Sequence, residues 1–203
     1  MYRLIDVAEI RMGATLRGRD ATRSNQSGSC HFVRIGDISQ DGGLLTDKLT
    51  RIEPNDPVNE DLFLRAGDVL FPNRGTRTTA LAYNLDLPHT IAGAQFFILR
   101  PNAALVLPEY LAWTLRSEKA ARYFDERRKG TYIKIIQRSD LAEMQIPVPP
   151  LNVQQKIAET AGLAVRERIL TERLASLKWK HTKSLLSRAA NDHSETNPKE
   201  PSK

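Results

Sequence analysis

The strongest constraint on this chain is a proline-rich run that precedes a long stretch without proline. Residues 145–159 read QIPVPPLNVQQKIAE and contain Pro147, Pro149 and Pro150. Each proline fixes its own φ, removes a backbone N–H donor and pushes the preceding residue toward extended geometry. Residues 145–150 therefore suit neither a helix nor a central strand. We expect a rigid segment that joins a folded domain to the C-terminal part of the chain.

The C-terminal part is predicted to be a single long helix. Asn152 suits the N-cap position, and Gln155 three residues later completes a variant of the capping box. From there to Ala190 the chain contains no proline and one glycine, Gly162. Such a helix has about 40 residues and is roughly 57 Å long. Residues 191–203 are polar and are expected to form a disordered tail.

The apolar residues of this helix recur in two series. One series has steps of four and comprises Ile157, Ala161, Val165 and Ile169. The other has the steps of a coiled coil and comprises Leu163, Leu170, Leu174 and Leu177. One interpretation is an amphipathic helix that lies across its own domain. A domain of about 150 residues offers no surface long enough to cover both series, so we expect part of the helix to form a dimer interface with another chain.

Residues 1–148 predict an α+β domain with a mainly antiparallel, twisted sheet and small helices. Short apolar segments bounded by Gly, Pro or Asn predict strands at 31–38, 68–71, 79–84, 94–100 and 129–136. Helices are expected at 3–10, from Pro108, again from Ser117, and for one turn capped by Ser139. Residues 13–29 are expected to be a loop, and the glycine pair at 41–43 a tight turn.

Several classes of protein are disfavoured by composition. No stretch approaches the roughly 20 apolar residues of a membrane span, and the N-terminus lacks the apolar segment of a secretory signal. We therefore expect a soluble, cytoplasmic protein with no membrane partner. The single cysteine, Cys30, excludes an internal disulfide, and the four histidines are too scattered to predict a metal site.

The positive charge is concentrated in two segments. The formal net charge is +6. Residues 11–34 carry five arginines against one aspartate, and residues 116–138 carry eight basic residues against three acids, whereas residues 36–68 carry eight acids against three bases. If the two basic segments meet in space they form a patch suited to phosphates, which supply most of the non-specific affinity for nucleic acid. The alternative is an ordinary solvated helix face at 116–129.

Two loops carry the residues most suited to DNA contact. FPNRGTRTT (71–79) places two forked arginine donors around a glycine, and RRKGTY (127–132) repeats the pattern with an aromatic ring. Arginine reads guanine bidentately and also clamps phosphates. Either loop is also compatible with an ordinary surface turn. The predicted DNA-binding residues are Arg17, Arg19, Arg23, Arg34, Arg74, Gly75, Thr76, Arg77, Arg127, Arg128, Lys129, Tyr132 and Lys134.

Catalytic motifs are absent from the sequence. It contains no phosphate-binding loop of the G-x-x-x-x-G-K-[ST] type, no G-x-S-x-G elbow and no H-E-x-x-H pair. Asp68 and the acids around it leave open a Mg²⁺-dependent nuclease, because clustered carboxylates hold metal ions in such enzymes. The sequence otherwise predicts a protein without catalytic residues or cofactor of its own.

Residues 146–159, IPVPPLNVQQKIAE, resemble the proline-rich junction of specificity (S) subunits of type I restriction-modification systems. The matching residues are Ile146, Pro147, Pro149, Pro150, Leu151, Gln154, Ile157 and Ala158. Weaker likenesses occur in the family's order: LIDVAEIRMGATLRG, FLRAGDVLFPNRGT, YIKIIQRSDLAEM and LASLKWKHTKSLLS. Val153 departs from the family, which commonly has a polar or acidic residue there.

The resemblance implies a DNA target recognition domain at 1–148 and a junction with a long dimerisation helix at 149–190. A typical S subunit has two of each, so this chain resembles half a subunit. Two copies, or this chain and a different half, would then pair through antiparallel helices, with Leu163, Leu170, Leu174 and Leu177 as the contact.

The resemblance also implies partners: duplex DNA, an adenine methyltransferase subunit that binds S-adenosylmethionine, and a restriction subunit that translocates DNA. In this mechanism Arg17, Arg19 and Arg23 hold phosphates, while Arg74, Arg77 and their neighbours read base edges. The alternative function is a DNA-reading adaptor of another phage-defence system.

Overall fold

This computed structural model describes residues 1–17, 24, 26–39, 41–46, 49–75, 79–130 and 134–195. The chain divides into two compact units, Met1–Glu159 and Thr160–Lys203. We call the first the N-terminal domain. The predicted fold class is confirmed: the chain is α+β, with mainly antiparallel sheets and a long C-terminal helix.

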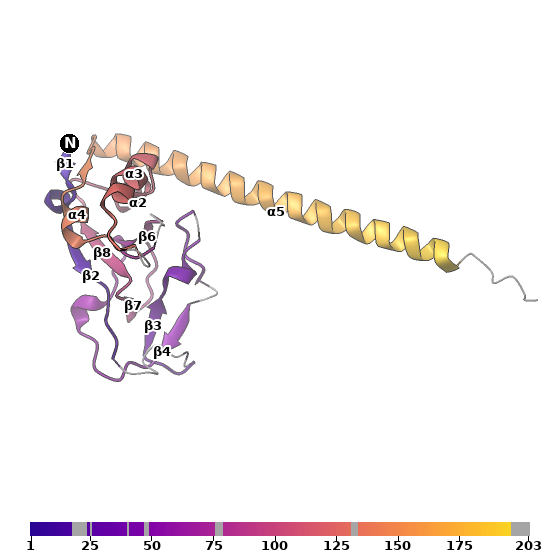
Figure 1. The fold of residues 1–203 in the computed structure, drawn as a ribbon, viewed down its shortest axis with the longest axis horizontal. Helices are drawn as coiled ribbons and strands as arrows, with labels where there is room; N and C mark the ends of the chain where they lie inside the picture. Colours follow the sequence, from indigo (N-terminus) through magenta and orange to yellow (C-terminus); the bar gives the residue numbers. More distant parts are fainter. Residues whose placement is uncertain are drawn as a thin grey trace, which may run out of the picture. The chain divides into compact units, whose positions relative to one another are not determined.

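The centre of the N-terminal domain is a four-stranded antiparallel sheet (Figure 1). Its strands, in spatial order, are β2 (Ala8–Met12), β8 (Phe96–Pro101), β5 (Asp68–Pro72) and β6 (Leu81–Tyr83). The last three confirm the strands predicted at 94–100, 68–71 and 79–84. β5 and β8 are central, which explains why their sequences read as nearly continuous apolar runs instead of alternating.

Side chains of the central strands alternate between two hydrophobic clusters. Val69 and Phe71 of β5 pack in the cluster that includes the helices, whereas Leu70 packs in the cluster on the opposite face. The helices on the first face are α1 (Leu4–Val7), α2 (Pro108–Leu115), α3 (Glu118–Arg127) and α4 (Arg138–Ala142). The period-two alternation of a strand thus places a helical layer on one face and loops and strands on the other.

A second sheet has three strands in the order β4 (Thr50–Ile52), β3 (Cys30–Val33) and β7 (Thr90–Ala92). The β3–β7 pair is parallel, and all the other strand pairs between named strands are antiparallel. A two-residue pair, β1 (Tyr2–Arg3) with β9 (Gln145–Ile146), brings the first residues beside the proline-rich segment. The sequence did not predict β1, β4, β7 or β9, because two or three residues are too few to show periodicity.

Two predicted elements near the N-terminus are shorter than expected. The helix predicted at 3–10 is a single turn, α1, and Ala8 already begins strand β2. The strand predicted at 31–38 ends at Val33, and the 3₁₀ turn η1 (Ile35–Asp37) comes next. The Asp37 carboxylate accepts the backbone N–H of Arg34 at 2.8 Å, which stabilises this turn against continuation of the strand.

Two predictions in the segment after α3 are wrong. Among the described residues of 129–136 there is no strand, and Ile135 forms isolated bridges with Lys129 and with Arg74. Ser139 does not cap α4, which begins at Arg138 after Gln137 and has no side-chain cap. By contrast, Ser117 caps α3 through its hydroxyl, which accepts the N–H of Ala120 at 3.2 Å, as its position before the helix predicts.

The turn predicted at 41–43 is confirmed by two hydrogen bonds, from Gly42 N to Ser39 O and from Ser39 N to Gly43 O. A further 3₁₀ turn, η3 (Glu60–Leu62), is capped by Asn59.

The long helix α5 spans Leu151–Glu195. The predicted capping box does not form: Asn152 lies within the helix, and Gln155 donates to Glu159 instead. The predicted tail is helical to Glu195, and residues 196–203 lie outside the described part of the chain. Among the described residues, none of the helices combines the length and apolar character needed to cross a membrane.

Candidate nucleic-acid interface

The first predicted DNA-contacting loop lies beside residues 134–136, which follow the second predicted loop (127–132). Arg74 forms an isolated antiparallel bridge with Ile135. Gly75 donates its N–H to the carbonyl oxygen of Lys134 at 2.8 Å, and Ile136 donates to the carbonyl of Asn73 at 2.9 Å. The backbone therefore brings the exposed residues Arg74 and Lys134 together from segments about 60 residues apart.

Arg34 and Arg74 line the same surface hollow, which has a volume of about 330 Å³. Its other polar side chains are Thr15 and Gln95, and its apolar lining includes Phe32. The Arg34 guanidinium lies over the Phe32 ring, 5.6 Å from the centroid, an arrangement that orients the cation. A concave site with two arginines and an amide is suited to an anionic or hydrogen-bonding ligand.

A close approach of two backbone segments forms one wall of this hollow. Ala14 donates to the carbonyl of Ala92 at 2.7 Å and forms a parallel bridge with Gly93. A Cβ on the neighbouring Gly13 would lie 2.2 Å from the carbonyl oxygen of Gly93, so that position requires glycine. Gly13 and Ala14 are therefore held by backbone contacts, although the sequence predicts only a polar loop there.

Arg17 is exposed and lines a neighbouring, smaller hollow of about 170 Å³ that also contains Asp56. Its carbonyl oxygen accepts the side-chain amide of Asn55 at 3.0 Å. Five of the predicted DNA-binding residues, Arg19, Arg23, Thr76, Arg77 and Tyr132, lie outside the described residues. Their roles stay predictions.

The basic cluster at the end of α3 is partly engaged in internal contacts. Arg127 lies over the Tyr123 ring, 3.8 Å from its centroid, and donates to the Tyr123 carbonyl. The Arg128 side chain is fully buried and pairs with Asp125, so it is not presented to a ligand. Lys129 is exposed, and its Nζ lies 3.4 Å from Oε1 of Gln137. Lys134 is the member of this segment that the structure places beside Arg74.

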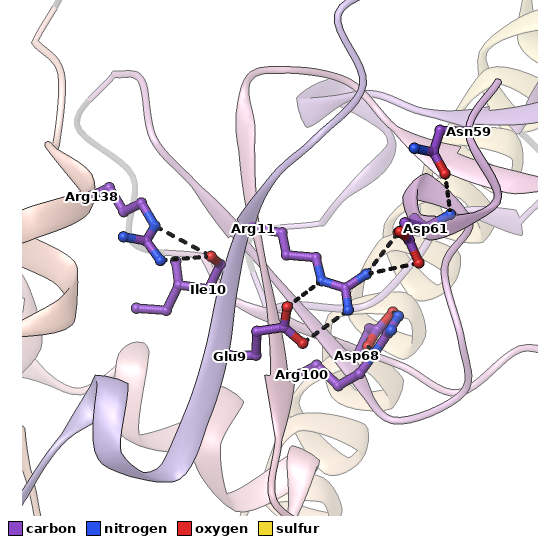
Figure 2. A network of polar contacts seen from close by, with 8 residues as sticks. All are labelled: Glu9, Ile10, Arg11, Asn59, Asp61, Asp68, Arg100 and Arg138. Atoms are coloured by element: carbon purple, nitrogen blue, oxygen red, sulfur yellow. Dashed lines mark hydrogen bonds and ion pairs between the residues drawn. The ribbon is translucent and has the colours of Figure 1, made fainter.

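Two arginines that contribute to the positive charge of the basic segments are structural (Figure 2). Arg11 forms a two-pronged ion pair with Glu9, at 2.7 and 2.9 Å, and donates to the backbone carbonyl of Asp61. The hydrogen bond from Arg11 lowers the pKa of the Glu9 carboxyl. Arg138 donates from two nitrogens to the carbonyl of Ile10, each at 3.2 Å. Counting charges along the sequence therefore overstates the cations available for a ligand.

Asp68, the residue on which the nuclease alternative depended, is also structural. Its side chain is 1% exposed, and its two oxygens accept from Arg100 at 2.8 Å each (Figure 2). One of them also accepts the backbone N–H of Arg65 at 2.9 Å. Both carboxylate oxygens are thus occupied, and the described residues contain no group of three acidic, histidine or cysteine side chains suited to a metal ion. The nuclease alternative is therefore not supported.

Sequence reasoning missed Gln95 and Thr15. Gln95 was assigned to a strand at 94–100, but β8 begins at Phe96 and Gln95 lies in the turn before it. The available signal was Gly93, because glycine commonly interrupts a strand pattern. Thr15 had no local signal, because its position beside the hollow depends on the contact between Gly13 and Gly93.

The predicted dimerisation leucines of α5 are all exposed. Their exposed fractions are 68% for Leu163, 56% for Leu170, 53% for Leu174 and 53% for Leu177. At 100° per residue, they fall within roughly 60° of one another around the helix. Trp179, Leu185 and Leu186 extend the set of exposed apolar side chains toward the C-terminus.

Comparison with protein families identifies a match over most of the chain. Residues 1–161 match the model of the type I restriction modification DNA specificity domain. Among curated proteins, the chain is similar to the type I restriction enzyme HindI specificity subunit of Haemophilus influenzae, with 28% identity over 136 residues. That alignment covers 63% of this chain and 28% of the relative.

Solved structures also resemble the fold, and two of them illustrate the match. One is the HsdS subunit from Thermoanaerobacter tengcongensis, with 22% identity, a TM-score of 0.59, and coverage of 100% of this chain and 50% of that chain. The other is a chain from a structure that addresses complex assembly and conformational transition of the type I R-M system, with 22% identity and a TM-score of 0.66. The match covers 90% of this chain and 42% of that chain. The chain thus spans half or less of the length of these relatives.

Proposed function

The chain belongs to the family of type I restriction modification DNA specificity domains, and from that premise we propose that its N-terminal domain binds duplex DNA and recognises one part of a target sequence. The observation that carries the proposal is the shared hollow of Arg34 and Arg74, with Lys134 held beside it by the Gly75 hydrogen bond. The family model describes a DNA specificity domain, which agrees with the prediction that the chain is not an enzyme.

Two kinds of contact are combined on this surface. Lys134 and the exposed Arg17 are suited to phosphates, which position a protein on DNA without reading its sequence. Arg34 and Arg74, in a concave site, are suited to base edges in the major groove, where an arginine fork matches guanine O6 and N7. Arg19 and Arg23 are proposed to contact phosphates as well, and Arg77 is proposed to contact base edges.

We further propose that α5 pairs this chain with a second recognition unit. A helix of 45 residues is roughly 67 Å long, and its leucine series is exposed. A seam of exposed leucines is unfavourable in water and is stabilised when a second helix covers it. The second unit is a second copy of this chain in the simplest arrangement, and the paired helices then set the spacing between two DNA half-sites.

The proposed complex also contains an adenine methyltransferase subunit, which would hold S-adenosylmethionine, and in some assemblies a restriction subunit. The chain itself would supply position and specificity, and it would act in the cytoplasm, where bacterial DNA is found. The alternative is a DNA-reading adaptor of another defence system. Co-expression with a type I methyltransferase subunit distinguishes the two, because stable co-purification supports the first function and its absence supports the adaptor.

Duplex binding by the full chain tests the DNA proposal. We expect affinity to fall steeply between 50 and 200 mM salt, since each phosphate contact releases counterions. The double variant Arg34→Ala/Arg74→Ala should lose at least about tenfold in affinity for its target. Arg122→Ala, which removes an exposed arginine of α3, is the matched control and should change affinity by less than about twofold. Salt-independent binding, or equal losses in both variants, would contradict the proposal.

Light scattering after gel filtration tests the pairing. Leu170→Glu combined with Leu174→Glu places two charges on the proposed seam and should convert the assembly to a monomer. Ser176→Glu places a charge on the opposite side of the same helix and should leave the assembly intact. A monomeric wild-type chain at micromolar concentration, with or without DNA, would rule out the homodimer.

A further inference from the structure

We infer that Gln95 is a base-reading residue, and that it selects adenine at one position of the DNA target. The inference rests on the proposed function and names a specificity determinant beyond the arginines. It depends on the hollow that Gln95 shares with Arg34 and Arg74.

The backbone of Gln95 is held firmly. Its carbonyl oxygen accepts the N–H of Asn73 at 2.9 Å, and the Asn73 side-chain amide donates to the neighbouring carbonyl of Ala94 at 2.9 Å. Phe96, the next residue, donates to the carbonyl of Gly93 at 3.0 Å and accepts the N–H of Gly13 at 2.9 Å. The buried Asn73 directly precedes Arg74, so the same residue ties the Gln95 turn to the arginine loop.

The side chain of Gln95, in contrast, is exposed, and its amide makes no hydrogen bond within the described part of the chain. A fixed backbone with an uncommitted amide at the edge of a hollow is the arrangement expected of a residue that binds a ligand. A structural glutamine differs: Gln154 is fully buried, and its amide makes three hydrogen bonds.

The chemistry of the amide selects the ligand. Glutamine offers one acceptor and two donors on a short planar group, a pattern that complements N6 and N7 of adenine in the major groove. It carries no charge, so it contributes little to counterion release and is a weak ligand for phosphate compared with its arginine neighbours. Arg34 and Arg74 complement guanine, so the hollow as a whole is suited to purines.

The test is selection from a randomised duplex library with the full chain, followed by competition binding. We compare wild type, Gln95→Ala and Gln95→Glu, with Gln145→Ala as the matched control at an exposed glutamine of β9. Wild type should select adenine at one position. Gln95→Ala should reduce the preference for adenine over the other bases roughly 5- to 150-fold at that position alone. Its affinity for non-target duplex should be unchanged.

Gln95→Glu sharpens the result, because a carboxylate accepts from cytosine N4 and should shift the preference at that position from adenine to cytosine. Gln145→Ala should select the wild-type sequence. An unchanged consensus for Gln95→Ala, in a chain that still binds its target, overturns this inference and leaves the proposed function standing. A wild-type chain that binds duplex without any sequence preference overturns both.

Discussion

Gly75 donates its backbone N–H to the carbonyl oxygen of Lys134 at 2.8 Å, and this hydrogen bond joins two loops that are distant in the sequence. Together with the bridge between Arg74 and Ile135, it holds one arginine and one lysine on a common surface. Residues 74, 75 and 134–136 belong to none of the named strands, so the position of Arg74 depends on a few backbone hydrogen bonds and on the conformation of Gly75.

Gly75→Ala tests that dependence. Gly75 has φ +86, a conformation that L-residues adopt at a cost of about 1–2 kcal/mol, and no atom would contact an added Cβ. We expect the free energy of unfolding in urea to fall by about that amount and target affinity to fall with it. Gly36→Ala is the control, because Gly36 is equally open but has no positive φ, and it should be neutral or slightly stabilising. If Gly75→Ala and Gly36→Ala changed the free energy of unfolding equally, a side chain at position 75 would cause no backbone strain, and the prediction would be wrong.

Asp68→Asn tests whether Asp68 is structural. The substitution removes the charge that pairs with Arg100 in a buried site, and breaking such a pair costs about 3–5 kcal/mol. Asp61→Asn, at an aspartate whose side chain is 73% exposed, should cost less than about 1 kcal/mol. Urea unfolding at neutral pH measures both. A stability loss confined to the Asp61 variant would contradict the assignment.

Gln154→Ala tests the anchor between the domain and the first turns of α5. Gln154 accepts from Leu107 N at 2.9 Å and donates to the carbonyls of Leu105 and Pro149 at 2.8 and 2.7 Å. Its loss leaves buried backbone groups unpaired and should reduce the free energy of unfolding by about 2–4 kcal/mol. The neighbouring Gln155→Ala removes an exposed contact with Glu159 and should cost only a few tenths of a kcal/mol. Similar losses for the two glutamines would rule out a specific anchor.

Tyr123→Phe tests a contribution to stability that depends on pH. Burial raises the pKa of Tyr123 above its ordinary value of 10.0, and the neutral hydroxyl donates to the carbonyl of Asp140 at 2.9 Å. Because the pKa is higher in the folded state, this contribution is fully present below pH 10 and is lost as the pH rises through the folded pKa. The stability of wild type relative to Tyr123→Phe should therefore be constant from pH 7 to about 10 and then decline. Urea unfolding across this range measures it, and a difference that stays constant to pH 11 would contradict the assignment.

Much of the chain's architecture was readable from its sequence, for identifiable reasons. Strands β5 and β8 are continuous apolar runs between turn residues, and Ser117 caps α3 because its hydroxyl is local to the helix start. The prolines at 147–150 and the absence of proline after them predicted the start of α5 to within two residues, since Asn152 was the expected N-cap and the helix begins at Leu151. Gln154 matched the family junction, but only the structure shows that its amide satisfies three buried backbone groups.

The features that the sequence determined by itself have local signals along the chain: the strands β5, β6 and β8, the helices α2 and α3, the proline junction and the leucine series. The tertiary structure decided which charges remain available. It tied Arg11 to Glu9, Asp68 to Arg100 and Arg138 to Ile10, and it placed Gln95 in the hollow that Arg34 and Arg74 also line. These pairings depend on which strands pair and in what register. Such contacts join residues tens of positions apart, so they produce no periodic pattern along the sequence.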